Sequence, residues 1–361
     1  MMLNFLYSAL LAGCSPAARV FSASPDGKGE TVDFDSVMGM EMREIAERKL
    51  HHGSNGYYLN FLGRQRQKRG FGRVLYWKLF DKNRFKPYLA AQPVKPVTID
   101  WQPIRNHRGL SVTYVNHASV LIKDIDRCII VDPVFDGLLW FIKDHSPLAF
   151  DLGELPPVDH VLVTHGHYDH LDKSSLAALG PEVHVVAPPG YEGIFDDVGL
   201  HRRTRLDWFE ATALGDWRVT CLPAHHWTMR NPLVGPNTAL WSGFLVRTGS
   251  GRTVYLSGDT AYWDGFADIG READIDLAII NLGAYAPRWF MSQSHLDPVE
   301  TVAAFRQLRA RRLMVVHWGT FRLGDEPVYL PPVALRREME KAGLAHRLVH
   351  LEAGETYRLD T

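Results

Sequence analysis

Four side chains of types that commonly bind metal ions lie within one short run of the sequence. The run reads Thr164-His165-Gly166-His167-Tyr168-Asp169-His170. It follows directly on segment 159–164, which predicts a strand, and a rigid strand can aim the side chains of the loop after it. Two histidines one residue apart can converge on one ion, and the adjacent Asp-His pair can face a second ion. We therefore interpret the run as part of a metal site and not as a solvated loop.

Four ligands cannot complete two metal sites, so further ligands must come from elsewhere in the chain. Three more predicted strands downstream are each followed by a residue of a type that can bind metal. They are the pair His225-His226 after segment 217–222, Asp259 after segment 254–256, and His317 after segment 313–316. A lone histidine at a strand end more often caps or packs than binds a metal. Four strand ends that each offer His or Asp make coincidence a poor explanation. The sequence predicts a metal centre assembled from several strand ends.

The elements that must position these residues alternate in a way that indicates an α/β fold. Predicted strands are 110–115, 119–123, 128–132, 159–164, 184–187, 217–222, 244–247, 253–257, 277–281 and 313–317, and predicted helices are 173–179 and 298–309. Along the chain, a β-rich stretch is followed by a stretch in which strands and helices alternate, and this pair of stretches then occurs a second time. Two such halves predict sheets sandwiched between helices, an αββα layering.

The pattern HxHxDH, then His, then Gly-Asp, then His resembles the metallo-β-lactamase superfamily, and this implies its αββα sandwich. Within the superfamily, 283–291 and 317–321 are similar to the N-acylphosphatidylethanolamine-hydrolysing phospholipase D group, whose bacterial members include RomA-like proteins. The resemblance covers roughly Val112 to Pro332, and a weaker similarity extends upstream through His51-His52-Gly53. Asn116-His117-Ala118-Ser119 departs slightly from the family's Gly-His-Ala-Thr.

The resemblance implies two zinc ions per chain and divides the ligands between them. One ion is expected on His165, His167 and His226, the second on Asp169, His170 and His317, with Asp259 bridging both. His226 is preferred to His225 as the ligand because it stands next to Trp227. Imidazole-rich sites suit zinc, although these ligand types exclude neither manganese nor iron.

Three further residues receive roles from the same resemblance. Asp132 is expected to orient a ligand by hydrogen bonding. His295 is expected on the substrate side, where it could bind phosphate or help protonate the leaving group, and with Asp259 it makes up the predicted catalytic pair. His117 resembles a buried histidine near the site, and a satisfied core histidine is the preferred interpretation.

The chemistry expected of such a centre is hydrolysis by a metal-bound hydroxide. Two cations depress the pKa of a shared water from 15.7 toward about 7 and neutralise charge at phosphorus. The predicted function is a phosphodiesterase of phospholipase D type that cleaves N-acyl phosphatidylethanolamine-like phospholipids. A lactonase or another soluble phosphodiesterase on the same site is the first alternative. A non-catalytic, metal-containing envelope lipoprotein is the second.

Residues 1–14 form a short apolar stretch that ends in Leu11-Ala12-Gly13-Cys14. This resembles a lipobox and predicts lipid attachment at Cys14, which would place the protein in the cell envelope as a membrane-anchored lipoprotein. The absence of Lys or Arg before the apolar run argues against export, and the alternative is a cytoplasmic or peripheral membrane protein. The predicted organisation is a signal segment 1–14, a tether and basic-aromatic extension 15–100, and a metallo-β-lactamase-fold domain 101–361.

The extension contains a segment in which basic and aromatic residues alternate. Between Arg64 and Lys86 there are nine Lys or Arg and one acid, Asp81. Such a mixture suits a membrane surface, and equally a helix that packs its aromatic residues on the main domain. The whole chain balances 40 Lys and Arg against 41 Asp and Glu, so a nucleic-acid partner is not expected. The expected partners are a phospholipid or another small phosphodiester, a membrane surface and, from the family resemblance alone, a second copy of the chain.

Overall fold

The computed structural model describes residues 37, 39–53, 56–60, 76–77, 80, 82–89 and 92–359, with the backbone of the two-residue strands β1 (Ser22–Ala23) and β2 (Glu30–Thr31). The predicted signal segment 1–14 with Cys14, almost all of the tether and most of the basic-aromatic segment lie outside the described residues. Among the described residues, no helix has the length and apolarity that crossing a membrane requires.

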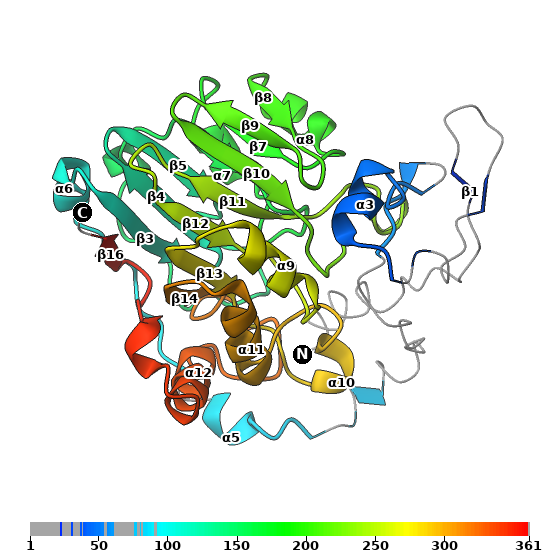
Figure 1. Cartoon of the computed structure of the whole chain (residues 1–361). Helices are drawn as coiled ribbons and strands as arrows, with labels where there is room; N and C mark the ends of the chain where they lie inside the picture. The colour runs from blue at the N-terminus through cyan, green and yellow to red at the C-terminus, as the bar shows by residue number, and fades with distance from the viewer. Residues whose placement is uncertain are drawn as a thin grey trace.

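Two seven-stranded sheets form the body of the molecule (Figure 1). The first sheet has the order β16-β3-β4-β5-β6-β7-β8. Its strands are β3 (Leu110–Asn116), β4 (Ser119–Asp124), β5 (Arg127–Val131), β6 (His160–Leu162), β7 (His184–Ala187), β8 (Arg203–Arg205) and β16 (Thr356–Leu359). Pairing is antiparallel from β16 through β5 and parallel from β5 through β8.

The second sheet repeats this mixture in the later part of the chain, with the order β15-β14-β13-β12-β11-β10-β9. Its strands are β9 (Ala211–Leu214), β10 (Trp217–Leu222), β11 (Gly243–Arg247), β12 (Thr253–Leu256), β13 (Leu277–Asn281), β14 (Arg312–Val316) and β15 (Leu348–Val349). Strands β9 to β12 pair antiparallel and β12 to β15 pair parallel. The carboxyl ends of parallel strands share one edge of a sheet, so loops after β6, β12 and β14 can meet there.

Helices cover the outer faces, because the crossovers between parallel strands must pass over the sheet. The helices are α3 (Met42–Glu47), α5 (Lys86–Leu89), α6 (Trp101–Asn106), α7 (Lys173–Ala178), α8 (Glu192–Asp197), α9 (Gly265–Glu272), α10 (Arg288–Met291), α11 (Pro298–Leu308) and α12 (Leu330–Lys341), with the 3₁₀ turns η2 (Leu152–Glu154) and η3 (Ala345–Arg347). Figure 1 shows α11 and α12 lying together beside β13 and β14. The predicted αββα sandwich is confirmed.

Alternation along the strands explains how one sheet has two apolar faces. In β5, Ile129 and Val131 join the core between the sheets, whereas Cys128 and Ile130 join a second core under α6, α7 and α8. Successive side chains of a strand point to opposite faces, and a sheet covered on both sides must be apolar on both. The larger core continues through the second sheet to Phe305 and its neighbours in α9, α11 and α12.

The start of α11 shows how local sequence fixes an element that leads toward the site. Asp297 accepts hydrogen bonds from the backbone N–H groups of Val299 and Glu300, and the Glu300 side chain accepts from the N–H of Asp297. Pro298 at the first helical position has no N–H to leave unpaired. This capping box places the helix start directly after His295 and Leu296.

Candidate metal centre

The predicted ligand residues come together where loops from the two sheets meet. The loop after β6 in the first sheet brings His165, His167, Asp169 and His170. The loops after β10, β12 and β14 in the second sheet bring His226, Asp259 and His317. All seven side chains are buried. The site is therefore built half by each sheet.

The first ligand group contains His165, His167, His226 and Asp259, and their ligand atoms lie within 4.8 Å of one another. His167 Nδ1 lies 2.8 Å from His165 Nε2 and 3.2 Å from His226 Nε2. Asp259 Oδ2 closes the group at 3.9 Å from His165 Nε2 and 3.7 Å from His226 Nε2. Three imidazole nitrogens and one carboxylate oxygen thus face a common centre.

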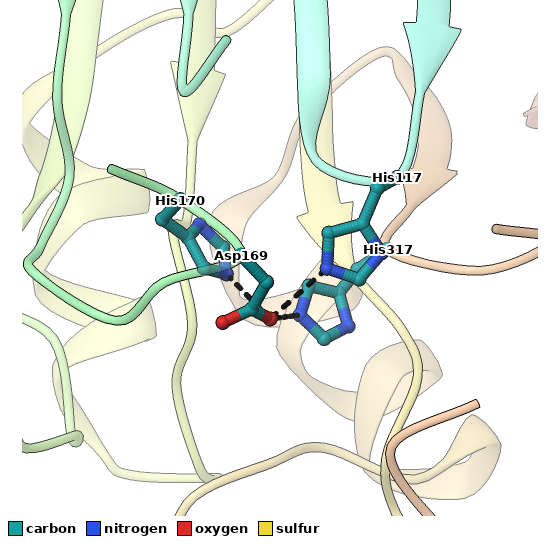
Figure 2. Close-up of side chains that lie close together, drawn as sticks. All are labelled: His117, Asp169, His170 and His317. Atoms are coloured by element: carbon teal, nitrogen blue, oxygen red, sulfur yellow. Dashed lines mark hydrogen bonds and ion pairs between the residues drawn. The ribbon is translucent and has the colours of Figure 1, made fainter. Parts of the chain in front are cut away.

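The second ligand group contains Asp169, His170 and His317, joined by His117 (Figure 2). Figure 2 shows the three imidazoles converging on one carboxylate oxygen, Asp169 Oδ2, which lies 3.0 Å from His117 Nε2, 3.6 Å from His170 Nε2 and 3.3 Å from His317 Nε2. The hairpin between β3 and β4 supplies His117. This arrangement offers a second centre beside the first.

Asp259 lies between the two groups. Its Oδ1 is 3.4 Å from His317 Nε2, and its Oδ2 is 3.3 Å from His170 Nε2 as well as close to the first group. The amide of Asn281 donates to Asp259 Oδ1 at 2.9 Å. Sequence reasoning did not foresee Asn281, although its place at the end of strand β13 is the same kind of position that drew attention to the ligands.

Unpaired nitrogens show that the donor set fits metal ions. His170 Nε2 and His317 Nε2 are buried and have no hydrogen-bond partner, although each faces carboxylate oxygens. A buried polar atom without a partner costs free energy, and coordination of a cation removes that cost. Imidazole nitrogen and carboxylate oxygen are zinc-type ligands. Metal ions therefore belong at these buried His and Asp residues.

Burial and mutual contact set the protonation states that a metal needs. Burial lowers the pKa of His167 to about 4 and holds those of His165 and His226 well below the usual value, so these imidazoles are neutral. Burial raises the pKa of Asp169 and Asp259, but the neighbouring histidines outweigh it and hold both well below the usual value. Neutral imidazole and ionised carboxylate are the metal-binding forms.

His170 differs because it faces several carboxylates. Burial lowers its pKa, but Asp259, Asp169 and Asp132 outweigh burial and hold it well above the usual value. Without a metal ion, a proton on His170 supplies positive charge that partly offsets the charge of these carboxylates. A metal ion that binds here displaces that proton.

Asp132 makes the contact that the sequence predicted for it. Its Oδ2 lies 2.7 Å from His170 Nδ1 and accepts from Thr164 Oγ1 at 2.6 Å, and its Oδ1 accepts from the backbone N–H of Thr164 at 2.7 Å. The carboxylate thus directs His170 Nε2 toward the centre. In the first group, the backbone oxygen of Ser294 lies 3.0 Å from His226 Nδ1 and has the same effect.

His295 lies at the edge of the centre. Its Nδ1 is 3.8 Å from Asp259 Oδ2, and its side chain is 15% exposed, whereas those of the ligand residues are almost completely covered. Arg288 Nη1 donates to the backbone oxygen of His295 at 2.9 Å and is itself paired with Glu300 at 2.6 Å. His225, which precedes the ligand residue His226 in the sequence, lies outside both ligand groups. The structure therefore brings His226 and not His225 to the centre.

The backbone around the ligand residues is also closely constrained. A Cβ at Gly166 would lie 2.6 Å from Tyr191, and one at Gly283 would lie 2.0 Å from the backbone oxygen of His317. His117, Asp132 and His317 have φ values of 40°, 43° and 72°. Non-glycine residues adopt this left-handed region rarely, and such strain clusters at functional sites.

Two adjacent metal-ligand groups lie between two mixed sheets, and loops at the strand ends supply their residues. This arrangement is that of a hydrolase of the metallo-β-lactamase class. The family model described as a beta-lactamase superfamily domain matches residues 127–318. The chain therefore belongs to the metallo-β-lactamase superfamily.

Individual relatives agree with this. The N-acyl-phosphatidylethanolamine-hydrolyzing phospholipase D 1 of Caenorhabditis elegans is 34% identical over 273 residues, which are 70% of this chain and 75% of the relative. A UPF0173 metal-dependent hydrolase of Rubrobacter xylanophilus is 28% identical over 254 residues, 68% of this chain and 96% of the relative. The solved metallo-beta-lactamase fold protein YhfI of Bacillus subtilis superposes with a TM-score of 0.51 at 17% identity, covering 69% of this chain and 98% of YhfI. The protein is a metal-dependent hydrolase.

Proposed function

We propose that the protein is a two-zinc phosphodiesterase of phospholipase D type that hydrolyses N-acyl phosphatidylethanolamine-like phospholipids. The position of Asp259 carries the two-ion part of the proposal. One of its oxygens faces His317 of the second group, and the other lies near both groups. A carboxylate so placed could supply a ligand oxygen to each of two ions, as two-metal hydrolysis requires. Zinc is proposed because imidazole predominates among the ligands.

The substrate class is proposed from similarity to the phospholipase D of Caenorhabditis elegans. With such a lipid, water attacks phosphorus, the bond to the ethanolamine oxygen breaks, and phosphatidic acid and an N-acylethanolamine leave. A membrane surface is part of the proposal because the substrate is a membrane lipid. Lipid attachment at Cys14 and a homodimer stay predictions, and Cys14 lies outside the described residues.

The residues of the chain prepare the reaction by position and charge. When bound, the two ions lower the pKa of a shared water toward about 7 and offset charge on the phosphoryl oxygens. Asp132 holds His170, and Asn281 holds Asp259, so the ligand atoms need little reorganisation. His295, at the exposed edge, is placed to donate a hydrogen bond to a phosphoryl oxygen or a proton to the leaving oxygen.

Metal analysis joined to a substrate panel tests the proposal. Purified full-length protein is analysed for zinc and assayed against N-acyl phosphatidylethanolamine in vesicles, an acyl lactone and a simple phosphodiester. Two zinc ions per chain and release of N-acylethanolamine with phosphatidic acid are expected. Turnover of the lactone alone would make the substrate assignment wrong, and hydrolysis of only the simple phosphodiester would remove the lipid from it.

A further inference from the structure

A segment far upstream of the ligands reaches the metal centre. We define the strap as the described residues 37, 39–53 and 56–60, which precede the family-matched residues 127–318. At its end, the side chain of Asn60 donates through Nδ2 to the backbone oxygen of His226 at 2.6 Å. His226 belongs to the first ligand group, so the strap holds the backbone of a metal ligand directly.

The loop that begins at His226 is held from two sides. On the strap side, the backbone N–H of Tyr58 donates to the backbone oxygen of Asn237 at 2.8 Å, and Asn237 Oδ1 accepts from the N–H of Thr228 at 3.1 Å. On the other side, Thr228 Oγ1 accepts at 3.1 Å from the N–H of Gly166, which lies between two ligands of the same group. The loop 226–228 is thus hydrogen-bonded both to the strap, directly and through Asn237, and to the histidine-rich loop.

The strap is also held to the body of the molecule by a cluster of contacts, the mooring cluster, that is separate from the two ligand groups. His51 Nε2 lies 2.7 Å from Asp207 Oδ1, and His52 Nε2 lies 2.6 Å from Asp207 Oδ2. Lys49 Nζ adds a contact to Asp207 Oδ2 at 2.8 Å. The buried ring of His51 stacks on Trp208 with centroids 4.4 Å apart and an angle of 13°. Paired hydrogen bonds and a stacked ring give the strap a fixed starting point for its path to Asn60.

Two imidazoles beside a carboxylate also resemble a metal site, but the contacts favour mooring. Distances of 2.6 and 2.7 Å are those of hydrogen bonds from imidazole N–H to a carboxylate. The Lys49 ammonium already lies against Asp207, and it also contacts Glu210 at 2.9 Å. A cation at this point would have to displace both the protons and the lysine.

We propose that Asn60 is a positioning residue for His226 and that the strap sets the zinc affinity of the first ligand group. The strap reaches the centre through the contact of Asn60 with His226, which belongs to the first group. The effect is therefore expected on the ion of that group. The inference rests on the proposed two-ion centre and not on the choice of substrate.

Zinc competition with a chelating dye tests this on the full-length protein, with two resolved binding steps expected for the native sequence. Asn60→Leu keeps the approximate size and removes the donor, and Asn60→Gln retains a donor. Asn60→Leu is expected to weaken one step by about tenfold or more and to leave the other within about twofold, because hydrogen-bonding partners of ligands typically govern affinity to this extent. Asn60→Gln is expected to recover part of the loss.

Tyr57→Phe is the matched control within the strap. It removes the hydrogen bond from Tyr57 Oη to the backbone oxygen of Val234, which is 3.1 Å long and exposed, and both steps are expected to stay within about twofold of the native values. Unchanged steps in Asn60→Leu, or equal weakening of both, would overturn the positioning role. A single zinc step in the native protein would instead contradict the two-ion centre on which the inference rests.

His52→Ala provides a second variant in case Asn60→Leu does not fold. It loosens the mooring cluster, which contains none of the ligand residues, and is expected to weaken the same step while making the strap more sensitive to limited proteolysis. A third zinc equivalent in the native protein that is lost in His52→Ala would overturn the mooring role. If the strap of His52→Ala is cleaved easily but both zinc-binding steps are unchanged, the strap does not influence the metal centre, and the proposal is contradicted.

Discussion

Two clusters in this molecule are made of the same residue types and have different roles. In the mooring cluster, the imidazoles of His51 and His52 each lie within hydrogen-bond distance of Asp207, and Lys49 adds a positive charge. In the metal centre, imidazole nitrogens lie 3.3–3.9 Å from Asp259 and two of them have no hydrogen-bond partner. Residue type alone therefore does not identify a metal site. Buried imidazole nitrogens that face a carboxylate without a hydrogen bond to it do.

Bond lengths give the physical reason for the difference. Zinc binds imidazole nitrogen and carboxylate oxygen at about 2.0–2.2 Å, so in a tetrahedral site the ligand atoms stand about 3.4 Å apart. The Asp259 oxygens lie 3.3–3.9 Å from the imidazole nitrogens of the centre, whereas the Asp207 oxygens lie at the hydrogen-bond distances of 2.7 and 2.6 Å from His51 and His52. Four predictions follow from this contrast, in order of decreasing effect.

Replacement of the central carboxylate should greatly reduce catalysis in the metal centre and leave it nearly unchanged in the mooring cluster. Asp259→Asn removes the charge between the two ligand groups, and we expect kcat to fall by about three orders of magnitude or more because each ion of the proposed two-zinc centre would lose a ligand. Asp207→Asn, assayed with zinc in excess, is expected to retain kcat within a few fold. Steady-state kinetics with metal analysis measures both. A similar loss in the two variants would show that the clusters are not different in kind.

Removal of metal should destabilise the protein through one cluster alone. A ligand at about 1,000 times its Kd stabilises the native state by about 4 kcal/mol, and dialysis against a chelator removes this contribution. We expect the thermal midpoint to fall and to recover when zinc is added back. With zinc in excess, a fall on chelation is also expected in Asp207→Asn, since the two ligand groups of the centre are unchanged in that variant. A midpoint that does not respond to chelation would contradict the metal centre.

Asp207→Asn should weaken the fold independently of metal. The substitution removes the charge and one of the two acceptor oxygens that face His51, His52 and Lys49, and we expect a loss of about 2 kcal/mol in the free energy of unfolding. Urea denaturation of the metal-free protein measures it. Arg43→Ala, which removes the exposed ion pair with Glu272, is the control and is expected to cost at most about 1 kcal/mol.

The mooring should also weaken in mild acid. Burial lowers the pKa of His51 below its usual 6.5, and the groups that face it are Asp207, His52, Lys49 and the ring of Trp208. The undocked strap then binds a proton that the docked strap excludes, so docking is complete above pH 6.5 and is lost as pH falls below it. Limited proteolysis of the strap from pH 7.5 to 5.5 should show faster cleavage at the lower pH. Cleavage that does not change with pH would contradict this assignment.

Much of the fold could be predicted because its strands are apolar runs that end at turn residues. The runs at 110–115, 184–187 and 277–281 became strands with nearly the same bounds. Polar edge strands were missed. Strand β8 reads Arg203-Thr204-Arg205 and β16 alternates weakly, and edge strands need less apolar surface than central ones.

The residues of the two ligand groups and Asp132 could be foreseen, but Asn281 and Asn60, which also hold residues of these groups, could not. A histidine or aspartate at a strand end is a local pattern, and the structure brings all seven predicted ligand residues together. Asn60 reaches a backbone oxygen 166 positions away, and such a contact leaves no spacing in the sequence. The weak similarity around His51-His52-Gly53 marked the strap but gave no indication of its contact with the centre.

The pairing of β16 with β3 has a consequence for the order in which the molecule can assemble. Thr356 pairs with Thr113 and Leu359 with Leu110, so the first sheet receives its edge strand from residues synthesised after every ligand. Pairings between distant residues form late, and domains fold as units. A growing chain therefore displays its histidine-rich loop well before the sheet beneath that loop is finished. Stable metal capture is expected only after β16 has been synthesised and has paired with β3.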